Sequence, residues 1–576
     1  MRKLQLLARS ASLFAAAAAC ALAAEATTPE AAAAPDAAVE RFRRADFLQR
    51  VVESNRTVQG RLAAFHSARS LYKGERAMYE PVFVGSTEWV DRQRPNTIEL
   101  ERSLRSGGEF IERNWNYNAG VETRTPTGGR VRVGGQMREL RNNVQRTVIV
   151  DLEAEYETSI GVVVEQPLLK NAGFGITSAA RRLAARGAEV NYQDFRRQLM
   201  LTLAQAEISY WELFLAQEAV ALSAESMQTA DTLLRDNRSR FESGRGARLD
   251  VLEAEAGQAL RRSRASVAQQ RQVEAMNRFA AFFAGSTYEH GTHYMVTDAP
   301  VPRTVVMDYQ RGASTALAMS PDVLKAQRQV EQERIRLGVA RNQRLPQVDL
   351  RGSFGSAGLG YNWGSAWKDS EKAVFPQWAV AVEMRVPLLT GIRERNEVKA
   401  ARHRLQQAEL SAEEMEIQVR TSLDAAMRRV ESTAFTARSN GEAVAFRRTL
   451  LSDRLTAREA GRADTRAVLE VEDELVAARL EHLDSEVEHQ RAVLEIQVLQ
   501  GNLLQNRGLE ISFAELETAT RDWAREHGGP LKFLHYQEPA SNEIGQTLPS
   551  EQVDGRAESD RSRWWRMKHT SQEKSQ

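Results

Sequence analysis

The sequence of 576 residues contains a single cysteine, Cys20, close to its N-terminus. A disulfide framework, a cysteine-based zinc site and a cysteine nucleophile are therefore excluded for the bulk of the chain. Neither sign of charge dominates, because 78 Lys and Arg residues stand against 77 Asp and Glu residues. This balance is not that of a nucleic-acid-binding arm, and charge alone names no partner.

The motifs of common enzyme classes are also missing. No pattern contains the spaced histidines of a zinc protease or a Gly-x(4)-Gly-Lys-Ser/Thr phosphate loop. His290 and His293 form one close pair, but beyond Glu289 no acidic residue lies at a recognisable ligand spacing. Four glycines after a strand pattern suit a surface turn between strands better than a nucleotide site: Gly352, Gly355, Gly358 and Gly360. We therefore expect no enzymatic activity, no cofactor and no metal.

The N-terminus has the three parts of a secretory signal. Basic residues precede an apolar stretch from Ala11 to Leu22, and small residues follow it, which predicts cleavage after Ala23 or Ala24. The stretch is shorter than the about 20 residues that a retained transmembrane anchor needs. Acylation of Cys20 is an alternative, although no leucine lies three residues before it.

Long apolar runs are absent from the rest of the chain. No later segment supplies 18 consecutive apolar residues, so helical membrane spans are excluded for the mature chain. If the mature protein enters a membrane, it must do so as a closed β-barrel.

The chain contains an internal repeat. Pro167-Leu168-Leu169 matches Pro387-Leu388-Leu389, 220 positions later. Gly244-Arg245 followed by Val251-Leu252-Glu253 recurs, 217 positions later, as Gly461-Arg462 followed by Val468-Leu469-Glu470, and Gly285 matches Gly501. Three landmarks in one order and nearly one register indicate a duplicated unit.

Each copy contains a segment in which apolar and polar residues alternate. This period of two predicts strands with one apolar and one polar face, as in a barrel with lipid outside and water inside. A half-exposed strand of a soluble sheet would alternate in the same way. The residues that would face lipid are Ile160, Val162 and Val164 in the first copy, and Trp378, Val380, Val382 and Met384 in the second.

The period then changes to that of a long helix. Apolar residues step by three and four without proline from about Gly175 to Phe241 and from about Ile392 to Glu459. At 1.5 Å per residue each helix would span about 100 Å. Both helices reach a glycine, turn and begin a second helical run, so each copy contains a long helical hairpin. About four main strands per chain are too few to close a barrel, which needs about eight, so the barrel must be shared between chains.

These features resemble the TolC-type outer-membrane efflux family. The resemblance extends from about Val39 to Leu504 and depends on the duplicated Pro-Leu-Leu turns, Leu345-Pro346-Gln347 and the two Gly-x(6)-Val-Leu tips. It implies an α+β membrane protein with two tandem repeats, each with long coiled-coil-like helices and two barrel strands. Three identical chains would form one 12-stranded barrel in the outer membrane of a Gram-negative bacterium, continued by a periplasmic α-helical tunnel.

The resemblance also implies partners and sites. The homotrimer would dock a periplasmic adaptor (membrane fusion) protein and work with an inner-membrane transporter, as a passive export duct in a tripartite efflux or type I secretion system. Some family members carry acidic rings just past the second tip; here Ala467 occupies the first such position and Glu470 the second. Candidate gate residues are Asp250, Glu253 and Glu470, and candidate docking residues are Ser243, Gly244, Arg245, Ala460, Gly461 and Arg462.

The expected organisation follows the repeat. The segment from Trp89 to Glu155 is longer than its counterpart and is compatible with an additional hairpin, extended strands or a large surface loop. A periplasmic coiled-coil structural or adaptor-like protein without a pore is the alternative function. The predicted parts are a signal peptide (1–23), an Ala/Pro-rich linker (24–38), a first repeat (39–285), a linker (286–312), a second repeat (313–505) and a partly disordered C-terminal extension (506–576).

Overall fold

The computed structural model describes part of the chain. The described residues are 39–95, 109–143, 145, 153–284, 292–300, 308–386, 391–460, 462, 464–509, 512–514 and 516. The predicted signal peptide with Cys20, the first linker, and residues 517–576 lie outside them. So do Gly285, Gly461 and the second Pro-Leu-Leu turn at Pro387.

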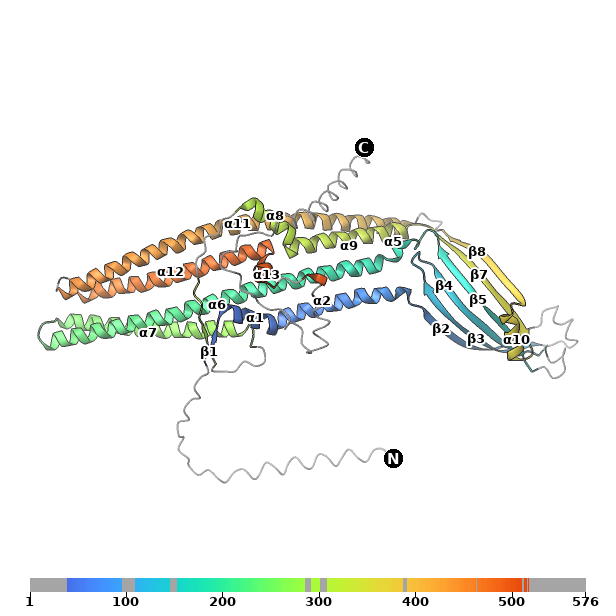
Figure 1. Cartoon of the computed structure of the whole chain (residues 1–576), viewed down its shortest axis with the longest axis horizontal. Coiled ribbons are helices and arrows are strands. Elements are labelled where there is room, and N and C mark those ends of the chain that lie inside the picture. Colours follow the sequence, from blue (N-terminus) through green and yellow to red (C-terminus); the bar gives the residue numbers. More distant parts are fainter. Residues whose placement is uncertain are drawn as a thin grey trace, which may run out of the picture.

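The molecule is a long slab with helices along most of its length and one sheet at one end (Figure 1). Both copies of the repeat contribute to both parts. The first copy contains α1 (Arg44–Ser54), α2 (Arg56–Gly74), a 3-10 helix (Glu75–Tyr79), β2 (Val82–Pro95), β3 (Glu109–Arg124), β4 (Arg130–Leu140), β5 (Glu155–Pro167), α5 (Phe174–Thr177), α6 (Ala179–Glu242) and α7 (Arg248–Ala280).

The second copy follows the same order with fewer strands. It contains α8 (Tyr309–Met319), α9 (Pro321–Gln343), β7 (Gln347–Gly360), α10 (Trp363–Glu371), β8 (Phe375–Arg385), α11 (Ile392–Glu459), α12 (Thr465–Gln500) and α13 (Leu503–Asn506). Two short strands, β1 (Val39–Phe42) and β6 (His293–Val296), pair in parallel between the copies. The predicted long helices are confirmed, since α11 begins and ends where the apolar period does.

The helices form a layer four helices wide. The helices α6 and α11 run its full length, and α9 and α12 lie end to end between them (Figure 1). Along the other side of α6, α2 packs against the half near the sheet and α7 against the far half. The layer therefore has two long edges, one formed by α11 and the other by α2 and α7.

Within the described residues, the sheet has six antiparallel strands in the order β2-β3-β4-β5-β7-β8. The prediction of two strands per repeat is correct for the second copy and wrong for the first, which supplies four. The extra pair, β3 and β4, is the segment whose structure the sequence left open. Its residues alternate weakly and are rich in polar side chains and glycine, so their pairing becomes evident only when β2 and β5 lie on either side.

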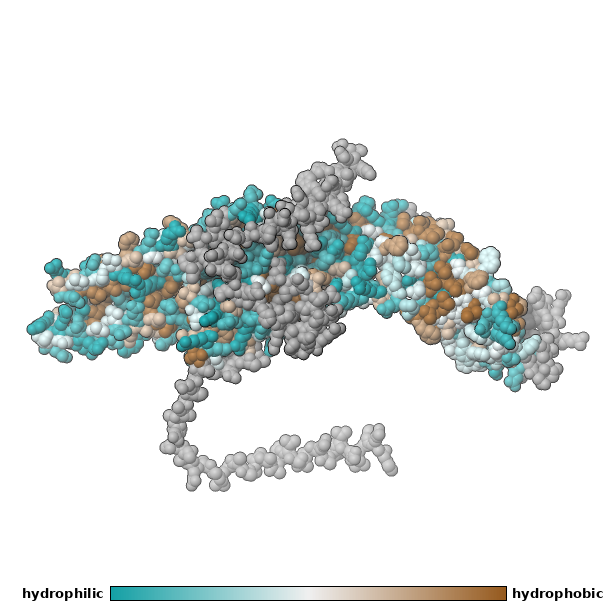
Figure 2. Space-filling view, in the orientation of Figure 1, coloured by the Kyte–Doolittle hydropathy of each residue, from teal (hydrophilic) through white to brown (hydrophobic). Residues whose placement is uncertain are grey.

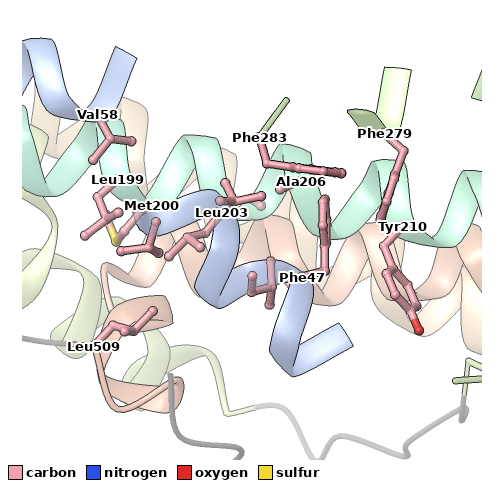
Figure 3. Close-up of a cluster of buried hydrophobic side chains, with 14 of the residues drawn as sticks. Phe47, Val58, Leu199, Met200, Leu203, Ala206, Tyr210, Phe279, Phe283 and Leu509 are labelled. Atoms are coloured by element: carbon pink, nitrogen blue, oxygen red, sulfur yellow. The ribbon is translucent and has the colours of Figure 1, made fainter. Parts of the chain in front are cut away.

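The main core lies where α1, α2, α6 and α7 meet, near the middle of the slab. Phe47 and Phe279 stack with ring centroids 4.1 Å apart, and Tyr210 and Phe283 lie beside them (Figure 3). Burying such a side chain stabilises the fold by about 1.5 to 3 kcal/mol. This cluster packs α1 and α2, at the start of the first copy, against the end of α7. The contact positions the long hairpin of α6 and α7.

The Tyr210 hydroxyl connects this core to the small β1–β6 sheet. It donates to the Phe42 carbonyl at 3.2 Å and accepts from the Asp298 amide at 3.0 Å and the Thr297 amide at 3.3 Å. Burial raises the pKa of Tyr210 to about 12, so the hydroxyl keeps its proton at neutral pH.

Candidate functional site

One face of the six-stranded sheet is apolar. Residues directly opposite each other in antiparallel strands share a face, and the register places one apolar residue from every strand in a single row. This face, called the apolar face below, appears as the brown band over the strands in Figure 2. The row consists of Phe83, Val121, Val133, Val162, Phe354 and Trp378.

All seven residues predicted to face lipid lie on the apolar face. Ile160, Val162 and Val164 of β5 and the four residues of β8 are brought to the same side because β7 pairs with both strands. Trp378 is 75% exposed and Val382 is 64% exposed, so the chain by itself leaves this surface uncovered.

The opposite face, called the polar face, carries charged side chains in ion pairs. Glu165 lies 3.4 Å from both Arg130 and Arg351, which flank it on the neighbouring strands. Arg351 also pairs with Glu383 of β8 at 3.2 Å. Such pairs are half-exposed and contribute little stability, but they make the polar face strongly hydrophilic.

A row of four glycines crosses the polar face. Gly120, Gly134, Gly161 and Gly355 are register partners on β3, β4, β5 and β7. A Cβ atom added to Gly134 would lie 2.5 Å from the Ala119 carbonyl oxygen, and the other three would meet the neighbouring strand in a similar way. The strands therefore approach one another here more closely than side chains would allow.

Helix α10 packs on the apolar face where β7 ends. The Thr158 hydroxyl lies 2.7 Å from both the Ala366 carbonyl and the Ser370 hydroxyl, in a buried contact. A Cβ atom on Gly358 would lie 2.0 Å from that same carbonyl. The prediction that Gly352 to Gly360 form a surface turn is wrong, because these glycines lie within β7, where two of them make room for α10.

Aromatic rings gather on the apolar face beside this helix. Trp115 of β3 lies between Trp89 and Tyr117, with ring centroids 4.8 and 6.0 Å away. Tyr117 in turn lies 6.5 Å from Trp363 of α10. Amphipathic rings of this kind are typical of a membrane–water boundary.

At the other end of the slab, the two helical hairpins end in equivalent tips. At each tip the C-cap residue, Ser243 or Ala460, donates its amide to the carbonyl four positions earlier at 3.1 Å. The backbone amide of the arginine two positions further on, Arg245 or Arg462, donates to the carbonyl five positions before that arginine, at 2.8 Å. Gly244 makes the turn with a φ of 73°, a conformation that favours glycine. The predicted docking residues at these tips are exposed, and Gly461 lies outside the described residues.

A buried polar cluster joins all four helices next to the tips. Asn237 of α6 donates to the Thr465 hydroxyl of α12 at 3.0 Å and to the Asp250 carbonyl of α7 at 2.9 Å. Arg458 of α11 donates to the Asn237 side-chain oxygen at 2.9 Å. Burial, and then the charge of Arg240, lower the pKa of Arg458. These four residues hold the two hairpins in one arrangement.

A second buried contact joins the hairpins further along. Arg261 of α7 is 2% exposed and forms an ion pair with Glu472 of α12, which is 6% exposed. Its Nε lies 3.0 Å from the carboxylate and 3.1 Å from the Ser226 hydroxyl of α6. Its Nη2 donates to the Leu469 carbonyl at 3.2 Å. Sequence reasoning missed this pair, because residues 211 positions apart give no local signal.

The three gate candidates lie near the tips in different settings. Glu470 forms an ion pair with Arg466 at 2.9 Å. The negative charge of Glu253, on the other hairpin, also attracts this arginine. The hydrogen bond and charge of Glu470, with the charge of Glu253, raise the pKa of Arg466. Asp250 instead accepts from the Ala247 amide at 3.3 Å in the first turn of α7, which is a capping contact. The structure thus brings Glu253 and Glu470 together around an arginine that the sequence did not single out.

Two kinds of feature are absent from the described residues. None of the helices there is long and apolar enough to cross a membrane. Among the same residues, no group of three or more His, Cys, Asp or Glu side chains is placed to hold a metal ion.

Comparisons with known proteins agree with this architecture. Residues 312–502 match the family described as outer membrane efflux protein. The outer membrane efflux protein BepC of Brucella suis biovar 1 (strain 1330) is 23% identical over 299 residues, which are 51% of this chain and 62% of BepC. The chain thus spans about 62% of the length of this curated relative.

Solved structures of low sequence identity share the fold. A membrane protein from Pseudomonas aeruginosa is 14% identical with a TM-score of 0.57, covering 79% of this chain and 89% of that one. The MtrE outer membrane channel of Neisseria gonorrhoeae, solved in an open state, is 15% identical with a TM-score of 0.56, covering 80% and 89%.

A sheet with one apolar and one polar face, continued by a layer of long helices, is the fold that this chain shares with these solved membrane proteins. The match over residues 312–502 and the likeness to BepC agree with the predicted resemblance to outer-membrane efflux proteins and with the predicted outer-membrane location.

Proposed function

We propose that three copies of this chain form a passive export duct that crosses the outer membrane and continues into the periplasm. The observation that carries the proposal is the continuity of the slab. A single sheet with an apolar and a polar face is joined to a helical layer four helices wide. In this arrangement the apolar face meets lipid, and the polar face lines the water-filled lumen.

Both long edges of the helical layer expose apolar side chains, which supports assembly side by side. On α11 these side chains recur on one helical face along the edge, and Phe446 is 74% exposed. On α7 a similar stripe follows the other edge. Rows of exposed apolar side chains along an edge are typical of protein interfaces. The residues are Leu410, Ile417, Phe435 and Phe446 on α11, and Leu249, Leu252, Leu260 and Val267 on α7.

The exposed hairpin tips are the surface for a periplasmic partner. Arg245 and Arg462 occupy equivalent positions on neighbouring hairpins, so the assembled ring would present six such arginines in an alternating pattern. A periplasmic adaptor protein that docks there, together with an inner-membrane transporter that supplies energy, completes the proposed export system. Glu253, Glu470 and Arg466 lie close enough to the tips to act at the periplasmic entrance.

The first experiment is cell fractionation, followed by detergent extraction and mass determination of the untagged complex. We expect recovery in the outer-membrane fraction and a mass near three chains. A soluble periplasmic monomer or dimer would contradict the proposal and would favour a coiled-coil structural protein without a pore. Planar-bilayer conductance of the purified complex then tests whether ions pass through it.

A further inference from the structure

The strand count of this chain differs from the pattern that the family resemblance implies. Two additional strands, β3 and β4, lie between β2 and β5. Strand β2 follows the helix α2, and β5 leads into α6, so a four-strand subunit would place these two strands side by side. Here β2 pairs with β3 along 14 residues, and β5 pairs with β4 along 11 residues. The sheet is therefore widened from within, and its two edges remain β2 and β8.

The added hairpin is fixed at the end of the sheet nearest the helices. Its turn, Thr125 to Gly129, rests on the start of the α5–α6 segment: the Gly173 amide donates to the Thr127 carbonyl at 2.9 Å. The Thr127 hydroxyl also lies 2.8 Å from the Gln166 side-chain oxygen, next to the end of β5. The β3–β4 hairpin therefore reaches the end of the sheet that adjoins the helices.

The widened sheet matches the width of the helical layer. Four helices spaced 8–10 Å apart occupy about 36 Å around a ring. Strands about 4.8 Å apart and tilted by about 40° occupy about 6 Å each around a barrel, so six take about 38 Å and four take about 25 Å. Six strands therefore continue the four helices without narrowing.

The directions of the edge strands allow the ring to close. Successive strands alternate in direction across the sheet, and because their number is even, β2 and β8 run in opposite directions. The β8 edge of one copy can then pair antiparallel with the β2 edge of the next. Both edge strands are exposed on both faces over nearly their whole length, as unpaired edges would be.

From this geometry, and resting on the proposed three-chain duct, we propose that a second copy of this chain pairs with each edge and that the barrel has eighteen strands. Its backbone radius is about 18 Å, against about 12 Å for twelve strands at the same tilt. The row formed by Gly120, Gly134, Gly161 and Gly355 adds no side chains to the inner wall at its level. The barrel is then about as wide as the helical tunnel and admits bulkier cargo than a twelve-stranded one.

Paired cysteines test the strand order in the assembled protein. Cys20 is the only cysteine of the sequence, so an introduced pair reports on one contact. Phe83→Cys with Val121→Cys, and Val133→Cys with Val162→Cys, join register partners and should cross-link within one chain. The control pair, Phe83→Cys with Val162→Cys, is three strand spacings or about 14 Å apart and should stay unlinked by a short reagent.

Ring closure is tested by pairing Val380→Cys of β8 with a cysteine at Phe83, Gly85 or Thr87 of β2, one at a time. All four positions are on the apolar face. At least one pair should give a ladder of linked chains that stops at three. A cross-link between Phe83→Cys and Val162→Cys in a three-chain complex would overturn the eighteen-stranded barrel but leave the duct standing. Absence of any three-chain complex would overturn the duct itself.

Electron microscopy of the unmodified complex gives an independent answer. We expect a barrel with a backbone diameter of about 36 Å, and a diameter near 24 Å would overturn the inference. The two values differ enough to be separated at modest resolution, and no substitution is needed that could disturb folding.

Discussion

Gly355 of β7 and Gly161 of β5 face each other so closely that a Cβ atom on Gly355 would lie 3.0 Å from the Cα of Gly161 and 2.5 Å from the carbonyl oxygen of Ile160. The contact is between two backbones, so no side chain can move aside to make room. It is one step in the row of glycines that crosses the polar face.

Replacing Gly355 by alanine should therefore destabilise the sheet. Overpacking of this kind costs about 1 to 3 kcal/mol, and we expect a lower temperature of dissociation for the complex in detergent, read from heat-dependent mobility on gels. Gly352→Ala is the matched control on the same strand, because a Cβ atom there would meet nothing within 4 Å. Equal dissociation temperatures for the two variants would contradict the close approach.

The buried ion pair between Arg261 and Glu472 should hold the two hairpins together. Removing one partner leaves an uncompensated buried charge, at a cost of about 3 to 5 kcal/mol, so Arg261→Met should increase hydrogen exchange in α7 and α12. Arg264→Met is the control, since Arg264 is exposed and pairs at 3.0 Å with Asp473, the carboxylate that also lies 2.8 Å from Arg261. The double variant Arg261→Met with Glu472→Met should recover most of the protection. Unchanged exchange in the single variant would argue against this role.

A charge on the apolar face should disturb insertion into the membrane. Val382→Arg is expected to cost about 2 to 4 kcal/mol if Val382 faces the middle of the bilayer. Ala379→Arg places the same charge on the polar face of the same strand, where we expect little effect. The measurement is the fraction of each variant that assembles in the outer membrane. Similar assembly of both variants would count against the proposed orientation of the sheet.

The Tyr210 hydroxyl should make stability depend on pH in the alkaline range. Because burial raises its pKa from 10.0 to about 12, the unfolded chain loses this proton first as the pH rises. Its contribution is complete below pH 10 and is lost between pH 10 and about 12. Tyr210→Phe should be less stable at neutral pH by about 1 to 3 kcal/mol, because two amides lose their acceptor.

Thermal denaturation of wild type and Tyr210→Phe across this range is the corresponding measurement. The difference in stability between them should shrink as the pH approaches 12. A constant difference across the range would show that the hydroxyl does not titrate as its burial requires.

Local sequence patterns determined much of this fold. The helix α11 was predicted from Ile392 to Glu459 because a period near 3.6 continues there without proline, and such a period depends on neighbouring residues alone. The alternation in β5 and β8 likewise places Ile160 and Val382 on the apolar faces of their strands without any knowledge of strand pairing. The duplicated tips were found for the same reason, since a glycine followed by a helix start is a local signal.

Other features depended on residues far apart in the sequence. The additional strands β3 and β4 could equally have been a loop, and only pairing with β2 and β5 makes them part of the sheet. Strand register is likewise what places Gly161 opposite Gly355. Arg261 and Glu472 meet because two separate hairpins pack together. By itself the sequence determined the helices, the strand faces and the repeat, because these follow from periodicity. The number of strands, the glycine row and the buried contacts between hairpins were decided only by the tertiary structure, because each depends on packing between segments distant in the chain.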